Sequence, residues 1–297
     1  MKQITIYDHN THPIWSKRYQ TIHVAHNRTN GGYTYSCDIV KFHLPIIMDL
    51  LKKQEKYQNI LISTVEFLSI EIIPHGTDLI ICYLHENIDR EVSRIKKWQQ
   101  DFKNIDIIYI ASRETVVSEI KKLGIKAIKV PMGIDTMEFE KYKLPDSERY
   151  NDKRVIYFGN TYLGKGNTLE TLRSVFTARG WIFDIISSNA FNGKKITRDE
   201  IMKLLPKYRY GVAEARCYLE MNVMGIKTLL CAEGNQGLIT NDEEFEYQKA
   251  HNFSDGKIWT FSPDIETCID NFDKAMLKSY DIRDALPELK KQLKALL

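Results

Sequence analysis

Short apolar segments rich in β-branched residues alternate with longer segments of helical period along almost the whole chain of 297 residues. Strands that are buried on both faces form continuous apolar runs, and helices cover them as the chain crosses from one parallel strand to the next. The alternation therefore predicts an α/β protein built on parallel sheets. A chain of this length suits two domains of roughly 150 residues each.

The expected elements fall into two series. The first half predicts strands at 4–7, 60–63, 79–83, 105–110 and 127–130, with helices at 38–53, 89–102 and 113–123. The second half predicts strands at 155–158, 183–187, 210–213, 228–231 and 258–261, with helices at 168–178, 198–205, 216–224 and 265–278. Ser112 is the expected N-cap of the helix at 113–123. Alternation this regular indicates two doubly wound layers.

The domain boundaries follow from this order. Residues 1–138 are expected to form the first domain and residues 153–280 the second. Residues 139–152 are rich in turn-forming residues and are predicted to be the linker. Residues 281–297 form an amphipathic, lysine-rich helix that is expected to pack on the domains.

Composition excludes several classes of protein. Lys and Arg (42) exceed Asp and Glu (39) by only three, so the net charge gives no general attraction to nucleic acid or anionic membrane. The five cysteines are odd in number and form no C-x-x-C pair, which favours free thiols in a reducing compartment. No segment approaches the roughly 18 uninterrupted apolar residues of a membrane span. A cytoplasmic protein is expected, with peripheral membrane contact as the most it could make.

A glycine-containing loop with a lysine follows the first strand of the second half. Gly159 and Asn160 end that strand, and Lys165 and Gly166 precede the next helix. Open α/β sheets bind ligands beyond the carboxyl ends of their strands, where main-chain N–H groups and helix N-termini converge. Glycines let the backbone approach an anion, and a lysine adds positive charge. The loop is a candidate diphosphate site; a plain strand-to-helix loop with an exposed lysine fits the same residues.

A glutamate lies five residues ahead of Gly225 in the predicted helix at 216–224. The carboxylate of Glu220 can accept two hydrogen bonds, and the diol of a ribose presents two donors. Glu220 is therefore a candidate ribose ligand, whereas a lone glutamate on a helix is more often solvated surface.

The order of these motifs resembles the large retaining GT-B family often called glycosyltransferase family 4. The resemblance is good from about residue 110 to residue 231 and loose over the first hundred residues. It rests on Gly-Ile-Asp at 133–135, on Gly159 with Lys165 and Gly166, and on Glu220 with Gly225 ahead of the strand at 228–231.

This resemblance implies a GT-B fold, in which two Rossmann-like, doubly wound parallel-sheet domains face a central cleft. The acceptor would bind to the N-terminal domain and the nucleotide sugar to the C-terminal domain. The roles of the family place Lys165 on the donor diphosphate and Glu220 on the ribose hydroxyls.

Two positions depart from the pattern of the family. Its usual Gly-Arg is Gly159-Asn160 here, which removes one cation from the diphosphate, and Arg216 is the candidate replacement. Its usual first glutamate lies eight residues before the second, whereas Glu214 precedes Glu220 by six. Glu214 is therefore only a candidate ligand of the donor sugar.

The first hundred residues contain further candidates. Gly31 and Gly32 resemble the glycine pair whose amides approach the donor phosphate in the family, although an ordinary turn fits as well. His85 follows the strand at 79–83, where the family often has a histidine near the reacting sugar; a structural histidine is the alternative. Residues 9–37 contain no acidic residue and combine aromatic with basic side chains, which favours either an acceptor surface or a packed irregular loop. The acceptor candidates are Trp15, Lys17, Arg18 and Tyr19.

The resemblance implies transfer of a sugar from a nucleoside diphosphate sugar, with a UDP-sugar expected, to a hydroxyl with retention of configuration. Lys165, Arg216 and the amides near Gly31 and Gly159 would stabilise the leaving diphosphate. A saccharide or glycolipid precursor is the favoured acceptor. No cofactor is expected beyond the co-substrate, and the lack of an Asp-x-Asp triplet or of metal-site spacing favours a metal-independent reaction.

Two other functions fit the sequence. One is a viral DNA glycosyltransferase that acts on 5-hydroxymethyl pyrimidine bases, suggested by the short chain and the basic, aromatic stretch at 9–37. The other is a non-catalytic protein that binds sugar nucleotides, suggested by Asn160 in place of arginine.

Overall fold

The chain divides into two compact units, Met1–Pro131 with Arg283–Leu297, and Met132–Ile282. This computed structural model describes residues 3–8, 21–26, 39–51, 56–57, 60–64, 76–84, 88–131, 133–159, 166–187, 190–232, 235–254 and 264–297. Each unit contains one sheet whose strands alternate with helices, so the protein belongs to the α/β class. The segment 139–152, predicted to be the linker, lies inside the second unit. Its first two residues are the last two of the short helix α5 (Thr136–Glu140), and it contains the 3₁₀ turn η3 (Asp146–Glu148).

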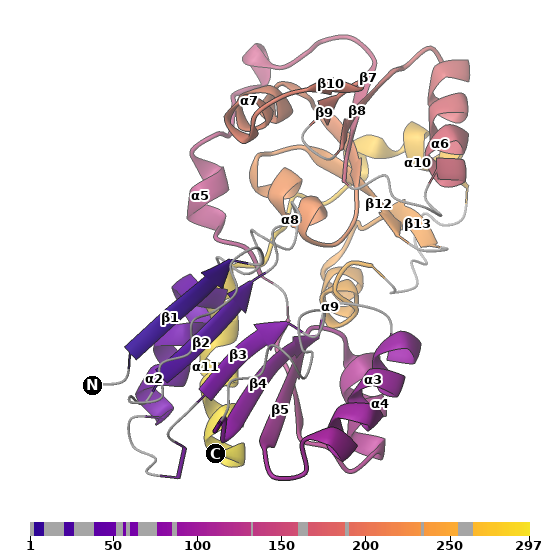
Figure 1. The fold of residues 1–297 in the computed structure, drawn as a ribbon. Coiled ribbons are helices and arrows are strands. Elements are labelled where there is room, and N and C mark those ends of the chain that lie inside the picture. The colour runs from indigo at the N-terminus through magenta and orange to yellow at the C-terminus, as the bar shows by residue number, and fades with distance from the viewer. Residues whose placement is uncertain are drawn as a thin grey trace. The chain divides into compact units, whose positions relative to one another are not determined.

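The sheet of the first unit is parallel throughout, and its strand order is the order of the sequence (Figure 1). It consists of β1 (Gln3–Asp8), β2 (Thr21–His26), β3 (Ile60–Thr64), β4 (Leu79–Leu84), β5 (Asp106–Ala111) and β6 (Ala127–Lys129). Five of these strands are predicted from the sequence. β2 is not, because histidines interrupt its apolar residues. The described strands of this sheet show no reversal of order, so the doubly wound topology expected for it is not seen there.

Helices pack on both faces of this first sheet. α3 (Ile88–Asp101) and α4 (Glu114–Lys122) cover the face that carries Cys82, through buried residues that include Trp98 and Ile120. Tyr83 points to the opposite face, because successive side chains of a strand alternate. Its hydroxyl lies 3.0 Å from Nδ1 of His43, at the end of the π-type turn η1 (Ile39–His43) that leads into α2 (Leu44–Leu51).

The C-terminal helix α11 (Ile282–Leu296) belongs almost entirely to this first unit. Lys290 of α11 lies 3.5 Å from Asp49 of α2, and Gln292 donates a hydrogen bond to the carbonyl of Lys129 in β6. At α4 the predicted cap is wrong: the N-cap residue is Arg113, and its side chain makes no capping hydrogen bond. Ser112 lies one residue too early because the helix begins at Glu114.

The environment of His43 predicts an acid-sensitive first unit. The side chain is buried, and burial lowers its pKa to about 4 from the ordinary 6.5. Between these two values the unfolded chain binds a proton that the folded chain does not. The free energy of unfolding therefore falls as the pH falls through this window, by up to about 1.4 kcal/mol per pH unit.

Wild-type protein is expected to lose about 2 kcal/mol more stability between pH 7 and pH 5 than His43→Gln, which cannot titrate. Urea unfolding at the two pH values measures the difference. Glutamine keeps a hydrogen-bonding group beside Tyr83, so the comparison isolates the proton. Equal pH dependence of the two proteins would contradict the prediction.

The sheet of the second unit is mostly parallel, with strand order β10-β9-β8-β7-β11-β12-β13. The parallel strands are β8 (Ile182–Ser187), β7 (Arg154–Phe158), β11 (Tyr210–Ala213) and β12 (Lys227–Ala232), all predicted from the sequence. The antiparallel additions β9 (Ala190–Phe191), β10 (Lys194–Lys195) and β13 (Asn235–Leu238) are not predicted. They are short and lack an apolar run. The strand predicted at 258–261 lies outside the described residues.

Helices also cover both faces of the second sheet. α6 (Gly166–Ala178) and α10 (Ile265–Asp270) bury Phe176 and Ile269 in a core that also contains Val155 and Val212. α8 (Ala215–Val223) packs on the other face, where Met221 contacts Gly211 of β11. The remaining helices are α7 (Arg198–Leu204), followed by the turn η4 (Leu205–Lys207), and α9 (Asp242–Ala250).

Two helix predictions in this unit are corrected. The helix expected at 265–278 ends at Asp270, because Asn271 caps it and the 3₁₀ turn η5 (Phe272–Lys274) follows. α9 is missed because its charged sequence has little apolar periodicity; its N-terminus is fixed by Asn241, whose side chain accepts a hydrogen bond from the Glu244 N–H. Across the described part of the chain, no helix combines the length and apolar character needed to cross a membrane.

Candidate functional site

The strand order of the second sheet reverses between β7 and β11. From β7 the chain moves outward to β8, and it later returns to β11 on the other side of β7. In open α/β sheets such a reversal marks the edge where ligands bind, because the connections leave it in opposite directions. Phe158 of β7 pairs with Ala213 of β11, so Gly159 and Glu214 both come directly after the paired strand ends. The topology therefore brings these two predicted site residues to one edge.

The turn from β11 into α8 has an unusual backbone. Glu214, the N-cap of α8, is extended, and the next residue, Ala215, has a φ of +47°. Its N–H donates to the carbonyl of Phe253 at 2.8 Å. A left-handed conformation costs a residue with a Cβ about 1–2 kcal/mol, and such strain collects at ligand-binding edges. The strain therefore coincides with the reversal of strand order.

Glu220 is buried on α8 and not on the protein surface. The residue is 2% exposed, and its Oε1 accepts a hydrogen bond from Nε of Arg216, one helical turn earlier, at 2.8 Å. Arg216 is also buried. The solvated-surface alternative for Glu220 is thus wrong, and the candidate cation and the candidate ribose ligand contact each other.

The second carboxylate oxygen of Glu220 faces a different arginine. None of the described residues donates a hydrogen bond to Oε2, and Nη2 of Arg198 lies 3.7 Å away. Arg198 is the first residue of α7, and its side chain is 43% exposed. A buried carboxylate is costly unless it is paired and hydrogen-bonded. Glu220 has one oxygen paired in this way and one that can still accept a hydrogen bond.

Gly159 has a structural role at this edge. Its N–H donates to the carbonyl of Ile186 in β8 at 3.2 Å, so the sheet already uses this amide. A Cβ at position 159 would lie 2.9 Å from the hydroxyl of Tyr157. A side chain at position 159 would have to displace the hydroxyl end of Tyr157, and the amide that the sequence predicts as a phosphate ligand already donates to β8.

The other predicted site residues lie outside the described part of the chain, and their placement is not tested. They are Trp15, Lys17, Arg18, Tyr19, Gly31, Gly32, His85, Asn160 and Lys165. Conversely, Arg198 was not predicted. It is a single arginine at the start of a helix, and only the folded chain brings its side chain within 3.7 Å of Glu220.

No protein-family model matches the chain, and no curated protein sequence matches it. Among the described residues there is no group of three or more His, Cys, Asp or Glu side chains that could hold a metal ion. The function proposed below is therefore inferred from the chain's own residues.

Proposed function

We propose that the protein is a glycosyltransferase of the GT-B type, which moves a sugar from a nucleoside diphosphate sugar to a hydroxyl acceptor with retention of configuration. The second unit would bind the nucleotide at the carboxyl edge of β7 and β11. A saccharide or glycolipid precursor is the proposed acceptor, and a UDP-sugar the proposed donor.

The buried carboxylate of Glu220 is the observation that carries this proposal. It lies on the helix that begins at the reversal of strand order, and Oε2 still accepts no hydrogen bond from the described residues. A ribose hydroxyl is a donor of the right kind for such an oxygen. Arg216 holds the other oxygen, so the carboxylate is already oriented before a ligand arrives.

Two arginines near this edge are candidates for stabilising a leaving diphosphate. Arg216 pairs with Glu220 on α8 and Arg198 lies 3.7 Å from the same carboxylate, while Glu214 adds a second carboxylate at the N-cap of α8. As the bond to the diphosphate breaks, negative charge grows on its oxygens, and preorganised positive groups stabilise it. Lys165, in the loop before α6, is the proposed direct contact.

Binding of sugar nucleotide without transfer is the second candidate. Arg216 already donates to Glu220, so it has less capacity to replace the arginine that Asn160 displaces. Slow hydrolysis of a UDP-sugar in the absence of acceptor would favour the transferase, because an enzyme that activates the donor also exposes it to water. A binding protein would leave the donor intact.

Glu220→Gln is expected to weaken UDP binding by about 10- to 100-fold, because the amide loses the charge that strengthens the hydrogen bonds to a diol. Calorimetric titration of wild-type and variant protein with UDP, GDP, ADP and CDP measures the change. Glu170→Gln is the control, since Glu170 lies on α6 with its side chain 68% exposed.

The thermal midpoint of each variant should be measured as well, because Arg216 loses its charged partner in Glu220→Gln. Wild-type protein that binds none of the four diphosphates at millimolar concentration would contradict the proposed function. Unchanged affinity in a folded Glu220→Gln variant would contradict the role of this carboxylate.

A further inference from the structure

We propose that Arg198 forms, together with Glu220, a two-sided site that selects the vicinal diol of a ribonucleotide over a deoxyribonucleotide. The proposal rests on the proposed function and adds a specificity-determining residue to it. Arg198 belongs to α7, outside the glycine, lysine and glutamate motifs of the sequence.

Both groups have unused hydrogen-bonding capacity. Nη2 of Arg198 lies 3.7 Å from Oε2 of Glu220, whereas hydrogen bonds between nitrogen and oxygen span about 2.7–3.2 Å. A guanidinium has five N–H donors, and no described residue accepts a hydrogen bond from that of Arg198. On the carboxylate side, Oε2 is buried and receives no hydrogen bond from the described residues.

A hydroxyl group matches this pair because it donates and accepts at once. One ribose hydroxyl can donate its proton to Oε2 of Glu220 while its oxygen accepts from an N–H of Arg198. The neighbouring hydroxyl of the diol can accept a hydrogen bond from a second N–H of the same guanidinium, since these donors point in parallel. A sugar that lacks the 2′-hydroxyl leaves one of these partners without a hydrogen bond.

Two contacts limit the movement of the pair. Arg216 donates a hydrogen bond to the other carboxylate oxygen, Oε1. The guanidinium carbon of Arg198 lies 5.8 Å from the ring centroid of Phe139 on α5, within the range of a cation–π contact. Phe139 is fully buried, so its ring is a fixed surface for an otherwise half-exposed side chain. Both hydrogen-bonding groups are thus oriented by neighbours within the second unit.

The test compares each ribonucleoside diphosphate with its 2′-deoxy counterpart, using UDP, GDP, ADP and CDP. Affinities are measured by calorimetric titration for wild type, Arg198→Ala and Arg173→Ala. Arg173 is a matched control because its side chain is also 43% exposed and is paired to one glutamate, Glu170. Wild type and Arg173→Ala are expected to prefer the ribonucleotide by about tenfold, the usual effect of one hydrogen bond to a charged group.

Arg198→Ala is expected to lose that preference, because the ribonucleotide loses two hydrogen bonds with the guanidinium and the deoxynucleotide loses one, so the ribonucleotide is weakened by about tenfold more. Arg198→Lys keeps the charge without the parallel donors and should recover little of the preference, which provides a second variant if the alanine protein is unstable. Variants that bind both nucleotides more weakly by the same factor, or keep the wild-type preference, would overturn the inference and leave the proposed function standing. Wild-type protein that binds no diphosphate would overturn both.

Discussion

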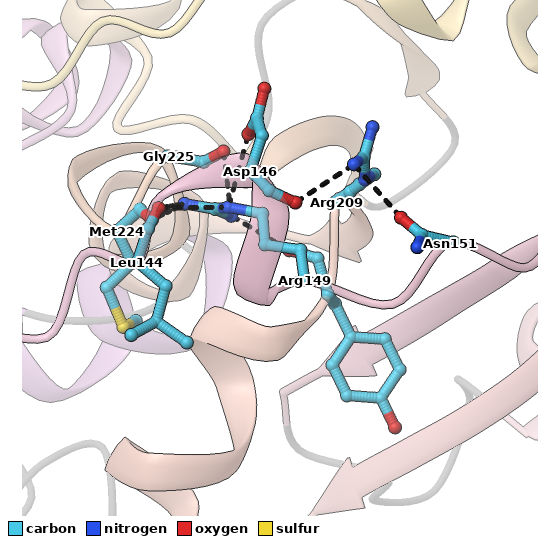
Figure 2. Close-up of polar contacts among 8 residues, drawn as sticks. Leu144, Asp146, Arg149, Asn151, Arg209, Met224 and Gly225 are labelled. Atoms are coloured by element: carbon cyan, nitrogen blue, oxygen red, sulfur yellow. Dashed lines mark hydrogen bonds and ion pairs between the residues drawn. The ribbon is translucent and has the colours of Figure 1, made fainter.

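Arg149→Met is expected to lower the free energy of unfolding of the second unit by about 4 kcal/mol, because it removes a buried donor group that joins three separate segments at one point. The side chain of Arg149 is buried and surrounded by main-chain carbonyl groups (Figure 2). Its five hydrogen bonds reach the carbonyls of Leu144, Tyr208, Met224 and Gly225, at 2.7–3.2 Å.

These four carbonyls explain the size of the effect. Met224 is the C-cap of α8 and Gly225 follows it, so the guanidinium lies at the negative end of the helix dipole. Leu144 lies on the segment before η3, and Tyr208 follows η4. A buried carbonyl that loses its donor costs about 1–3 kcal/mol, and the hydrogen bonds to Tyr208 and Met224 are buried whereas those to Leu144 and Gly225 are partly buried. Methionine fills much of the volume but donates nothing.

Scanning calorimetry is the direct measurement, with an expected fall of roughly 10 °C in the transition of the second unit. Arg149→Lys keeps a positive charge but has fewer donors, so it should recover part of the loss. Arg209→Met is the control: Arg209 donates to Asp146 and Asn151 in the same region but is more exposed, and a loss below about 1 kcal/mol is expected. A change of less than 2 °C for Arg149→Met, as an order-of-magnitude limit, would disprove the anchoring role.

Gly133→Ala is expected to cost the second unit about 3 kcal/mol, because its main chain packs directly against another segment of main chain. A Cβ at this position would lie 2.5 Å from Cα and 2.6 Å from N of Ile282, and 2.9 Å from the carbonyl carbon of Asp281. The next residue, Ile134, pairs with the same segment: its N–H donates to Tyr280 and its carbonyl accepts from Ile282. An alanine would have to force these paired segments apart.

Gly180→Ala separates this clash from the ordinary cost of replacing a glycine. Gly180 has a φ of +77° and open space where a Cβ would be, so only the left-handed conformation is penalised, by about 1 kcal/mol. Urea unfolding of both variants gives the comparison. A Gly133→Ala protein as stable as Gly180→Ala would contradict the close approach.

The parallel strands were predictable because each is a short apolar run with clear ends. β4 and β12 are examples, and both carry buried residues along most of their length. β2, β9, β10 and β13 were not, since hairpin additions and strands interrupted by histidine lack that pattern. The order of the strands in a sheet cannot be predicted from hydrophobic periodicity, because it depends on contacts between residues that are distant in the sequence.

Part of the candidate site was predictable in the same way. Glu220 and Arg216 lie four residues apart on one helix, so their contact follows from the helical repeat. The burial of Glu220 did not follow, because it depends on how α8 packs on its sheet. Arg198 could not be found at all, since the rest of α7, the turn η4 and the strand β11 separate it from the helix it faces.

The two ends of α8 have different surroundings. The end near Gly225 is fastened by Arg149, and the half that carries Arg216 and Glu220 faces the edge where the strand order reverses. Substitutions near the N-terminal end of α8 therefore leave the hydrogen bonds of Arg149 to Met224 and Gly225 intact. The buried pair of Arg216 and Glu220 would have to be exchanged as a unit, because replacing one partner leaves the other charge buried without it.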